Sequence, residues 1–134
     1  MNREIKFRGL SINGEWYYGN LAIIKKKVDH IEAGCYISNS AGMPFAYQVR
    51  PETVTQFTGL LDKNGKEIYE GDLFRIIDPE DKSTCEIVFK DGAFRKKYWQ
   101  WEDGLQYPII DKFDLENFEV IGNIYENPEL LKTL

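Results

Sequence analysis

The sequence predicts a mainly β protein in which an N-terminal β region, residues 1–56, packs on a small barrel, residues 57–134. Three observations predict this fold class. Short runs of apolar and polar residues alternate with the two-residue period of half-buried strands. The turn-forming pairs Asn13-Gly14, Asn64-Gly65 and Asp91-Gly92 separate such runs. Hardly any segment has the apolar spacing of an amphipathic helix, which favours an all-β class.

The N-terminal region is predicted to contain a hairpin followed by two shorter strands. Asn13-Gly14 is a tight-turn signal, and a long aromatic and β-branched run follows it until Lys25-Lys26-Lys27. The last strand of this region is expected to stop at Pro51, because proline has no backbone N–H for a sheet hydrogen bond. The expected strands lie near residues 5–7, 15–24, 35–37 and 45–49.

The central segment predicts a second hairpin and a corner. Asn64-Gly65 predicts a type I′ turn, because both residues tolerate the positive φ that this turn requires. Gly71 lies between Glu70 and Asp72 and predicts a corner before the next strand. Asp91-Gly92 then predicts a third hairpin. The strands expected after the corner lie at residues 73–77, 85–89 and 93–95, with a polar loop at residues 78–81.

The C-terminal segment is less regular. Residues 96–101 could extend the returning strand or begin a loop, and residues 102–114 are predicted to be mostly loop because of Gly104 and Pro108. A last strand is expected at residues 118–124. Asn127-Pro128-Glu129 then has the order of an N-cap, a proline at the first helical position and an acid in the first turn. This order predicts a short C-terminal helix whose leucines pack on the sheet.

Three ordered blocks of the sequence resemble the YopX family of phage and prophage proteins. The resemblance implies a small, mostly β, cytoplasmic protein of phage or prophage origin, with a C-terminal half similar to an SH3-like barrel. It implies no established activity. The blocks are REIKFRG at residues 3–9, FTGL followed by Asp62, Asn64-Gly65 and IYEGD within residues 57–72, and FEVIGNIYENPEL at residues 118–130.

Composition and charge narrow the classes of function. The chain has 134 residues, 43% of them hydrophobic, which is enough to bury a core. Its net charge of −5 disfavours a general nucleic-acid binder, since such affinity comes largely from Lys and Arg. No apolar stretch approaches the roughly 20 residues of a membrane helix, and no signal peptide is recognisable at the N-terminus. Cys35 and Cys85 each stand alone, so we expect small buried side chains and a cytoplasmic location.

The sequence contains few candidates for chemistry, and we predict no catalytic, cofactor-binding or metal-binding residue. The single histidine, His30, lies in a polar segment without a nucleophile motif, so we interpret it as an exposed loop residue. Asp62-x-Asn64-Gly65 resembles the start of a calcium loop, but the glycine comes too early. Glu70 and Asp72 could serve acid–base chemistry. A corner whose acids accept neighbouring backbone N–H groups is the preferred interpretation.

The segment from Arg95 to Trp101 is the strongest candidate for a contact surface. Cations followed by aromatic side chains could follow a phosphate backbone and stack on bases. Protein contact is favoured instead, because Trp, Tyr and Arg dominate interface energetics and the chain is acidic. The segment contains Arg95, Lys96, Lys97, Tyr98, Trp99 and Trp101.

The sequence therefore predicts a non-enzymatic binding or assembly module that contacts itself, as a homo-oligomer, or another phage or host protein. Exposed aromatic side chains and unpaired strand edges would form the contacts. The alternative is an accessory nucleic-acid-binding protein that uses residues 95–101. A small hydrolase or nuclease based on Glu70 and Asp72 is a third, weaker hypothesis.

Overall fold

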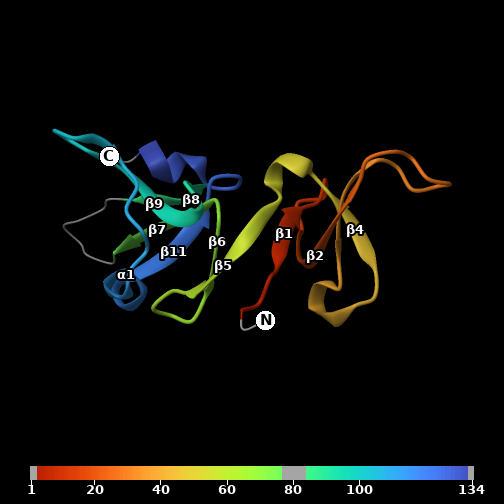
Figure 1. The fold of residues 1–134 in the computed structure, drawn as a ribbon, viewed down its shortest axis with the longest axis horizontal. Helices are drawn as coiled ribbons and strands as arrows, with labels where there is room; N and C mark the ends of the chain where they lie inside the picture. Colours follow the sequence, from red (N-terminus) through yellow and green to blue (C-terminus); the bar gives the residue numbers. More distant parts are fainter. Residues whose placement is uncertain (1–2, 77–83, 133–134) are drawn as a thin grey trace. The chain divides into compact units, whose positions relative to one another are not determined.

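The computed structural model describes residues 3–76 and 84–132, which form a mainly β protein with 52% strand (Figure 1). The strands form two antiparallel sheets, accompanied by one short α-helix among the described residues. The chain divides into two compact units, Met1–Phe57 and Thr58–Leu134. This division falls one residue beyond the end of the predicted N-terminal region. None of the described helices has the length and apolar character needed to cross a membrane.

The first unit is built from antiparallel strands in the order β4-β3-β2-β1-β5. The predicted N-terminal hairpin is confirmed as β1 and β2, and the two shorter strands are confirmed as β3 and β4. Two 3-10 turns, η1 (Ser40–Gly42) and η2 (Pro51–Thr53), lie on either side of β4 in the sequence. The strands are β1 (Phe7–Leu10), β2 (Trp16–Ile24), β3 (Gly34–Ser38), β4 (Ala46–Val49) and the beginning of β5 (Thr55–Leu61).

Two strand glycines allow close packing in the first unit. A Cβ atom at Gly9 would lie 2.5 Å from Cγ2 of the buried Val49, and one at Gly19 would overlap the carbonyl oxygen of Ser38. Glycine is therefore required at these positions by the approach of neighbouring groups rather than by an unusual φ.

The second unit contains a five-stranded antiparallel sheet in the order β10-β9-β8-β7-β11. The end of β5 continues into this unit and pairs with β6. The polar loop predicted at residues 78–81 and the last predicted residue of the strand before it, Ile77, lie outside the described residues. The elements are β6 (Glu67–Tyr69), β7 (Asp72–Ile76), β8 (Cys85–Lys90), β9 (Ala93–Gln100), β10 (Gly104–Gln106), α1 (Lys112–Asn117), β11 (Phe118–Asn123) and η3 (Pro128–Lys132).

The core of the second unit lies between this sheet and the segments that cover it. Phe74 and Phe118 stack with their ring centroids 5.0 Å apart. Partly buried side chains from β5, β9, α1 and β11 surround the fully buried residues. The buried core residues are Ile68, Phe74, Ile87 and Ile110, and the residues packed against them include Leu60, Phe94, Leu115, Phe118 and Val120.

The closed, SH3-like barrel predicted for this unit is not found among the described strands, which form an open sheet. The turn between β5 and β6, and not another strand, forms hydrogen bonds with the edge of β11. The backbone N–H of Lys63 donates to the carbonyl oxygen of Phe118 at 3.2 Å, and the N–H of Val120 donates to Oδ2 of Asp62 at 2.9 Å. These bonds satisfy strand-edge groups, which removes one reason for barrel closure.

The turn after β5 differs from the predicted type I′ geometry. Of Asn64 and Gly65, only Gly65 has positive φ, 80°, and its N–H donates to the carbonyl oxygen of Asp62. The loop is therefore longer than a two-residue turn, and Asn13-Gly14 lies in a similar loop with Gly14 at φ 83°. Asp91-Gly92 has positive φ at both residues, 52° and 79°, as a type I′ turn requires.

Asp62 explains the longer turn between β5 and β6. Its carboxylate is buried, and Oδ1 accepts the backbone N–H groups of Asn64 at 2.8 Å and Lys66 at 2.9 Å. Its other oxygen accepts the N–H of Val120 on β11. A carboxylate that accepts three N–H groups stabilises this loop over the alternative turn, and the sequence contained no signal for the bond to β11.

The prediction that residues 102–114 are mostly loop missed two short elements. Gly104–Gln106 forms β10 and pairs with the end of β9, and helix α1 begins at Lys112. Asp111 and Asp114 form a capping box that starts this helix. The C-terminal helix predicted after Asn127 is present as the 3-10 helix η3, and Leu130 in it is half-buried.

We expect Asp62→Ala to lower the free energy of unfolding of the second unit by about 2–4 kcal/mol, because it leaves three N–H groups without their charged acceptor. Asp62→Asn keeps one acceptor oxygen and should lose about half as much. Urea denaturation followed by circular dichroism measures both. Glu129→Ala, which removes an exposed acid, is the matched control. An Asp62→Ala protein as stable as this control would contradict the assignment.

Candidate functional site

The predicted contact segment, residues 95–101, lies on β9 and in the turn that follows it, and the strand divides its side chains between two faces. Lys96 and Tyr98 lie on one face, and Lys97 and Trp99 lie on the other, because side chains alternate along a strand. Trp101 lies beyond the strand, and its side chain is 89% exposed. The six residues are therefore not all on one face, although Lys96, Tyr98, Trp99 and Trp101 line one groove.

The guanidinium group of Arg95 donates hydrogen bonds to backbone carbonyl groups of its own unit. Its Nε donates to the carbonyl oxygen of Lys90 at 2.9 Å, and its Nη1 donates to that of Tyr107 at 3.2 Å. Lys97 lies opposite Glu86 in the β8–β9 register, so a carboxylate is its cross-strand neighbour. These partners reduce the positive charge that the segment can present to a ligand.

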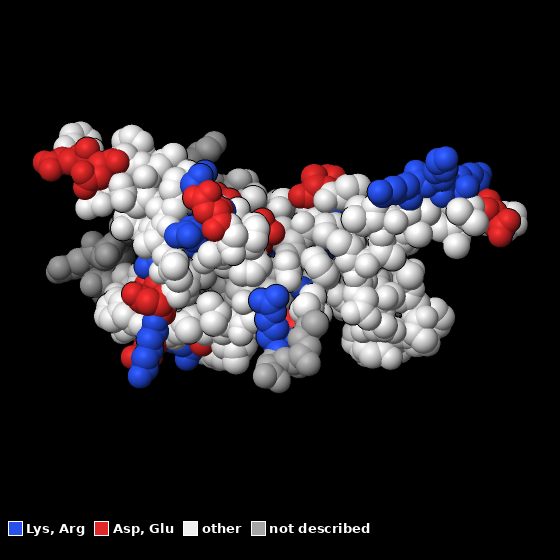
Figure 2. All heavy atoms as spheres, in the orientation of Figure 1, with Lys and Arg blue, Asp and Glu red and all other residues white. Residues whose placement is uncertain are grey.

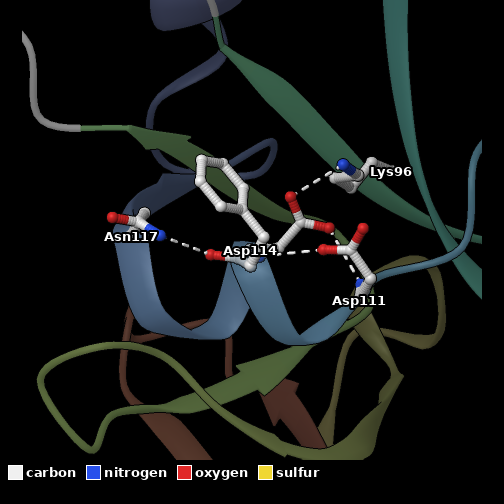
Figure 3. Close-up of polar contacts among 5 residues, drawn as sticks. Lys96, Asp111, Asp114 and Asn117 are labelled. Carbon is white, nitrogen blue, oxygen red and sulfur yellow. Dashed lines mark hydrogen bonds and ion pairs between the residues drawn. The ribbon is translucent and has the colours of Figure 1, made fainter.

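Lys96 forms a buried ion pair with Asp114 of α1 (Figure 3). Its Nζ lies 2.8 Å from Oδ1 of Asp114, and the two side chains are 13% and 2% exposed. The other oxygen of Asp114 accepts the backbone N–H of Asp111, and Oδ1 of Asp111 accepts the N–H of Asp114. The lysine also lies over the ring of Phe118, with Nζ 5.6 Å from the ring centroid. This network joins strand β9 to the first turn of α1.

A groove of about 510 Å³ lies over this ion pair. We call it the aromatic groove. The aromatic side chains of its lining are accessible, since Trp99 and Phe113 are each 58% exposed and Trp101 is exposed almost completely. The groove is lined by Ile76, Thr84, Cys85, Lys96, Tyr98, Trp99, Gln100, Trp101, Asp111, Phe113, Asp114 and Phe118.

Three exposed acids lie in the lining of the aromatic groove or directly follow it in sequence. Glu102 and Asp103 are exposed in the turn between β9 and β10, and Figure 2 shows acidic side chains gathered at the end of this hairpin. Asp111 is exposed at the start of α1. The backbone N–H of Asp114 lowers the pKa of the Asp111 carboxyl below its ordinary value, and the nearby Lys96 adds to the effect. Asp111 is therefore an anion at neutral pH.

Of the remaining candidates, Cys85 lines the aromatic groove, whereas Cys35, Glu70 and Asp72 do not. Oδ2 of the buried Asp72 accepts the backbone N–H of Tyr69 at 2.7 Å, as the corner interpretation expects. Glu70 is half-buried in the same turn. Cys35 and Cys85 are free thiols, the first half-buried and the second buried. Within the described ranges, no group of three or more His, Cys, Asp and Glu side chains is arranged to hold a metal ion.

A second exposed feature lies in the first unit, where residues 25–33 connect β2 to β3. We call this segment the lysine arm, because it begins with Lys25-Lys26-Lys27 and all nine of its residues are exposed. It includes His30, at the tight turn between Val28 and Ile31. Lys and Arg side chains gather along it in Figure 2. The three lysines are evident in the sequence. Strand periodicity alone did not show that the segment containing them lies outside the strands of the sheet.

The two acids around α1 were missed by sequence reasoning. An acid three residues after Asp111 was the available signal, since that spacing is typical of a capping box. The helix has only six residues, which is too short for an apolar period to be recognised. The pairing of Asp114 with Lys96 joins residues 18 positions apart and had no local signal.

Comparison with known proteins decides the family. The family model described as YopX protein matches residues 6–132, which is nearly the whole chain. The chain belongs to the YopX family. The resemblance inferred from the three sequence blocks is therefore confirmed.

This YopX-family chain is similar to two known proteins, one in sequence and one in structure. It is 33% identical over 70 residues to the SPbeta prophage-derived uncharacterized protein YopX of Bacillus subtilis (strain 168). That alignment covers 51% of this chain and 52% of the relative, so the match spans about half the length of the relative. The crystal structure of protein EF1440 from Enterococcus faecalis is similar with a TM-score of 0.62 and 25% identity, over 97% of this chain and 99% of that one.

We expect Lys96→Met to lower the free energy of unfolding by about 3–5 kcal/mol, because it leaves the carboxylate of Asp114 buried without its cation. Asp114→Asn in the Lys96→Met background should recover part of this loss, since the neutral amide can be buried at lower cost. Lys112→Met removes an exposed lysine whose distance to Glu116 is 3.8 Å, and should change stability by less than about 1 kcal/mol. Thermal and urea unfolding distinguish these variants, and equal effects of the two lysine changes would contradict the role of Lys96.

Asp111 should make the YopX-family protein less stable in acid. Its pKa is lower in the folded protein than in the unfolded chain, so its contribution is present above the unfolded value of about 4 and is lost as pH falls through the folded value. Asp111→Asn keeps an acceptor for the helix but does not titrate. We expect the unfolding free energy of the variant to decline less steeply below about pH 4. Identical slopes in urea titrations at several pH values would contradict this prediction.

Proposed function

We propose that this YopX-family protein is a cytoplasmic, non-enzymatic binding or assembly module of phage or prophage origin that acts through protein–protein contacts, including contacts between its own copies. One observation carries the proposal: Trp99, Trp101 and Phe113 are exposed around the aromatic groove. Large aromatic side chains are enriched among the residues that dominate binding energy at protein interfaces. The likeness to a prophage-derived protein supports the phage or prophage origin.

The floor of the groove supports a binding role over a catalytic one. Lys96 and Asp114 neutralise each other, and Asp114 also accepts a backbone N–H. A partner that covered the groove would therefore not leave these charges buried without a counterpart. A catalytic acid or base would instead need to contact a substrate, whereas Lys96 and Asp114 already contact each other.

Nucleic-acid binding through residues 95–101 is the alternative. Lys97 is the cation of this segment that could contact a phosphate, because Arg95 and Lys96 already contact groups in their own unit. Salt-dependent binding of single-stranded and duplex oligonucleotides tests this alternative. Loss of that binding in Lys97→Ala would favour it. Binding that is absent, or unchanged in the variant, would remove it.

We expect the full chain to self-associate, and we expect Trp101→Ala combined with Phe113→Ala to weaken the association at least about tenfold. Sedimentation velocity and light scattering over a concentration series measure the dissociation constant. Ile12→Ala, which truncates a 79% exposed apolar side chain in the first unit, is the control and should leave the constant unchanged. A wild-type protein that stays monomeric at the highest concentration would contradict the self-association.

A further inference from the structure

The lysine arm combines exposed cations with two exposed apolar side chains. Nζ of Lys27 lies 3.2 Å from Oε1 of Glu32, whereas Lys25 and Lys26 form no ion pair with any residue that the structure describes. Val28 and Ile31 close the tip through two backbone hydrogen bonds of 3.0 and 2.9 Å. Their side chains remain 57% and 51% exposed. The arm therefore presents two cations, and Val28 and Ile31 present apolar surface on either side of the turn residues Asp29 and His30.

The aromatic groove has the complementary chemistry. Its exposed apolar side chains can cover the tip of an incoming hairpin, and its volume of about 510 Å³ lies within the range of sites that bind a few side chains. Asp111 lines the groove, and Glu102 and Asp103, which directly follow the lining residue Trp101, add negative charge at the end of the hairpin. We call these three acids the rim. Lys96 does not oppose an incoming cation, because Asp114 compensates its charge.

We infer that the aromatic groove of one copy binds the lysine arm of a second copy. This inference rests on the proposed self-association and specifies the surfaces that form it. Val28 and Ile31 pack against the groove aromatics, while Lys25 and Lys26 lie near the acids of the rim. Charge pairing at a rim chiefly sets specificity and association rate, and apolar burial supplies most of the affinity.

This contact joins two different surfaces, so each copy in the assembly can use both. An interface of this kind is heterologous and produces a ring if the rotation closes, or an open chain of copies if it does not. The rim charges are exposed, so added salt should weaken the contact. A symmetric contact between two identical surfaces would instead stop at a dimer.

A charge-exchange experiment on the full chain tests the inference. The arm variant carries Lys25→Glu and Lys26→Glu, and the rim variant carries Glu102→Lys and Asp103→Lys. In each variant alone, the arm and the rim have the same sign of charge, so we expect self-association at least about tenfold weaker than in the wild type. In an equimolar mixture, the acidic arm of one variant meets the basic rim of the other. We therefore expect the mixture to associate as the wild type does, in sedimentation velocity over a concentration series.

Matched controls distinguish the effect of charges at the arm and the rim from the effect of the protein's net charge. Lys63→Glu with Lys66→Glu, and Glu116→Lys with Glu129→Lys, change charge by the same amounts at exposed positions elsewhere in the second unit, and should associate normally. Circular dichroism of each variant establishes that it folds, and recovery in the mixture cannot come from unfolded chains.

The outcomes distinguish this inference from the proposed function. If the wild type associates but the arm and rim variants behave like their controls, the inference is overturned and self-association through other surfaces stands. If the single variants are weakened but their mixture does not recover, direct pairing of arm and rim is overturned. If the wild type is monomeric at all concentrations, both the inference and the proposed self-association fail.

Discussion

The ion pair between Lys96 and Asp114 is the interaction on which the candidate site depends. It joins strand β9 to helix α1 (Figure 3), and both elements supply lining residues of the aromatic groove. Asp114 also takes part in the capping box that starts the helix. A buried carboxylate is stable in such a position only when a cation and hydrogen-bond donors surround it. The same contacts thus hold the groove in place and neutralise its floor.

Side chains in turns accept backbone N–H groups in both units. Ser11 accepts the backbone N–H groups of Asn13 and Glu15, and Asp62 accepts those of Asn64 and Lys66. Asp62 additionally reaches β11, where it occupies an edge N–H that another strand could have bound. An open sheet can therefore satisfy part of its edge without closing into a barrel.

Membership of the YopX family assigns this chain to a group with a prophage relative of uncharacterised function, so its role must be argued from its surfaces. The aromatic groove and the lysine arm belong to different units, and each combines apolar side chains with charged ones. One combines aromatic side chains with acids, and the other combines lysines with the exposed apolar side chains of Val28 and Ile31. Exposed apolar patches that are rimmed by polar residues are typical of contact surfaces.

By itself, the sequence determined the mainly β class, the positions of most strands and the family. The alternation of side chains and the turn residues specify structure between near neighbours in the chain. The family is identified by ordered blocks of residues that can be read directly from the sequence. Only the tertiary structure decided the geometry of the turns at Asn13 and Asn64, the open form of the sheet, and the pairing of Lys96 with Asp114. Each of these depends on bonds between residues far apart in the chain, such as Asp62 with Val120. Strand and turn propensities describe neighbours, and they contain no information about which distant group will satisfy a buried charge.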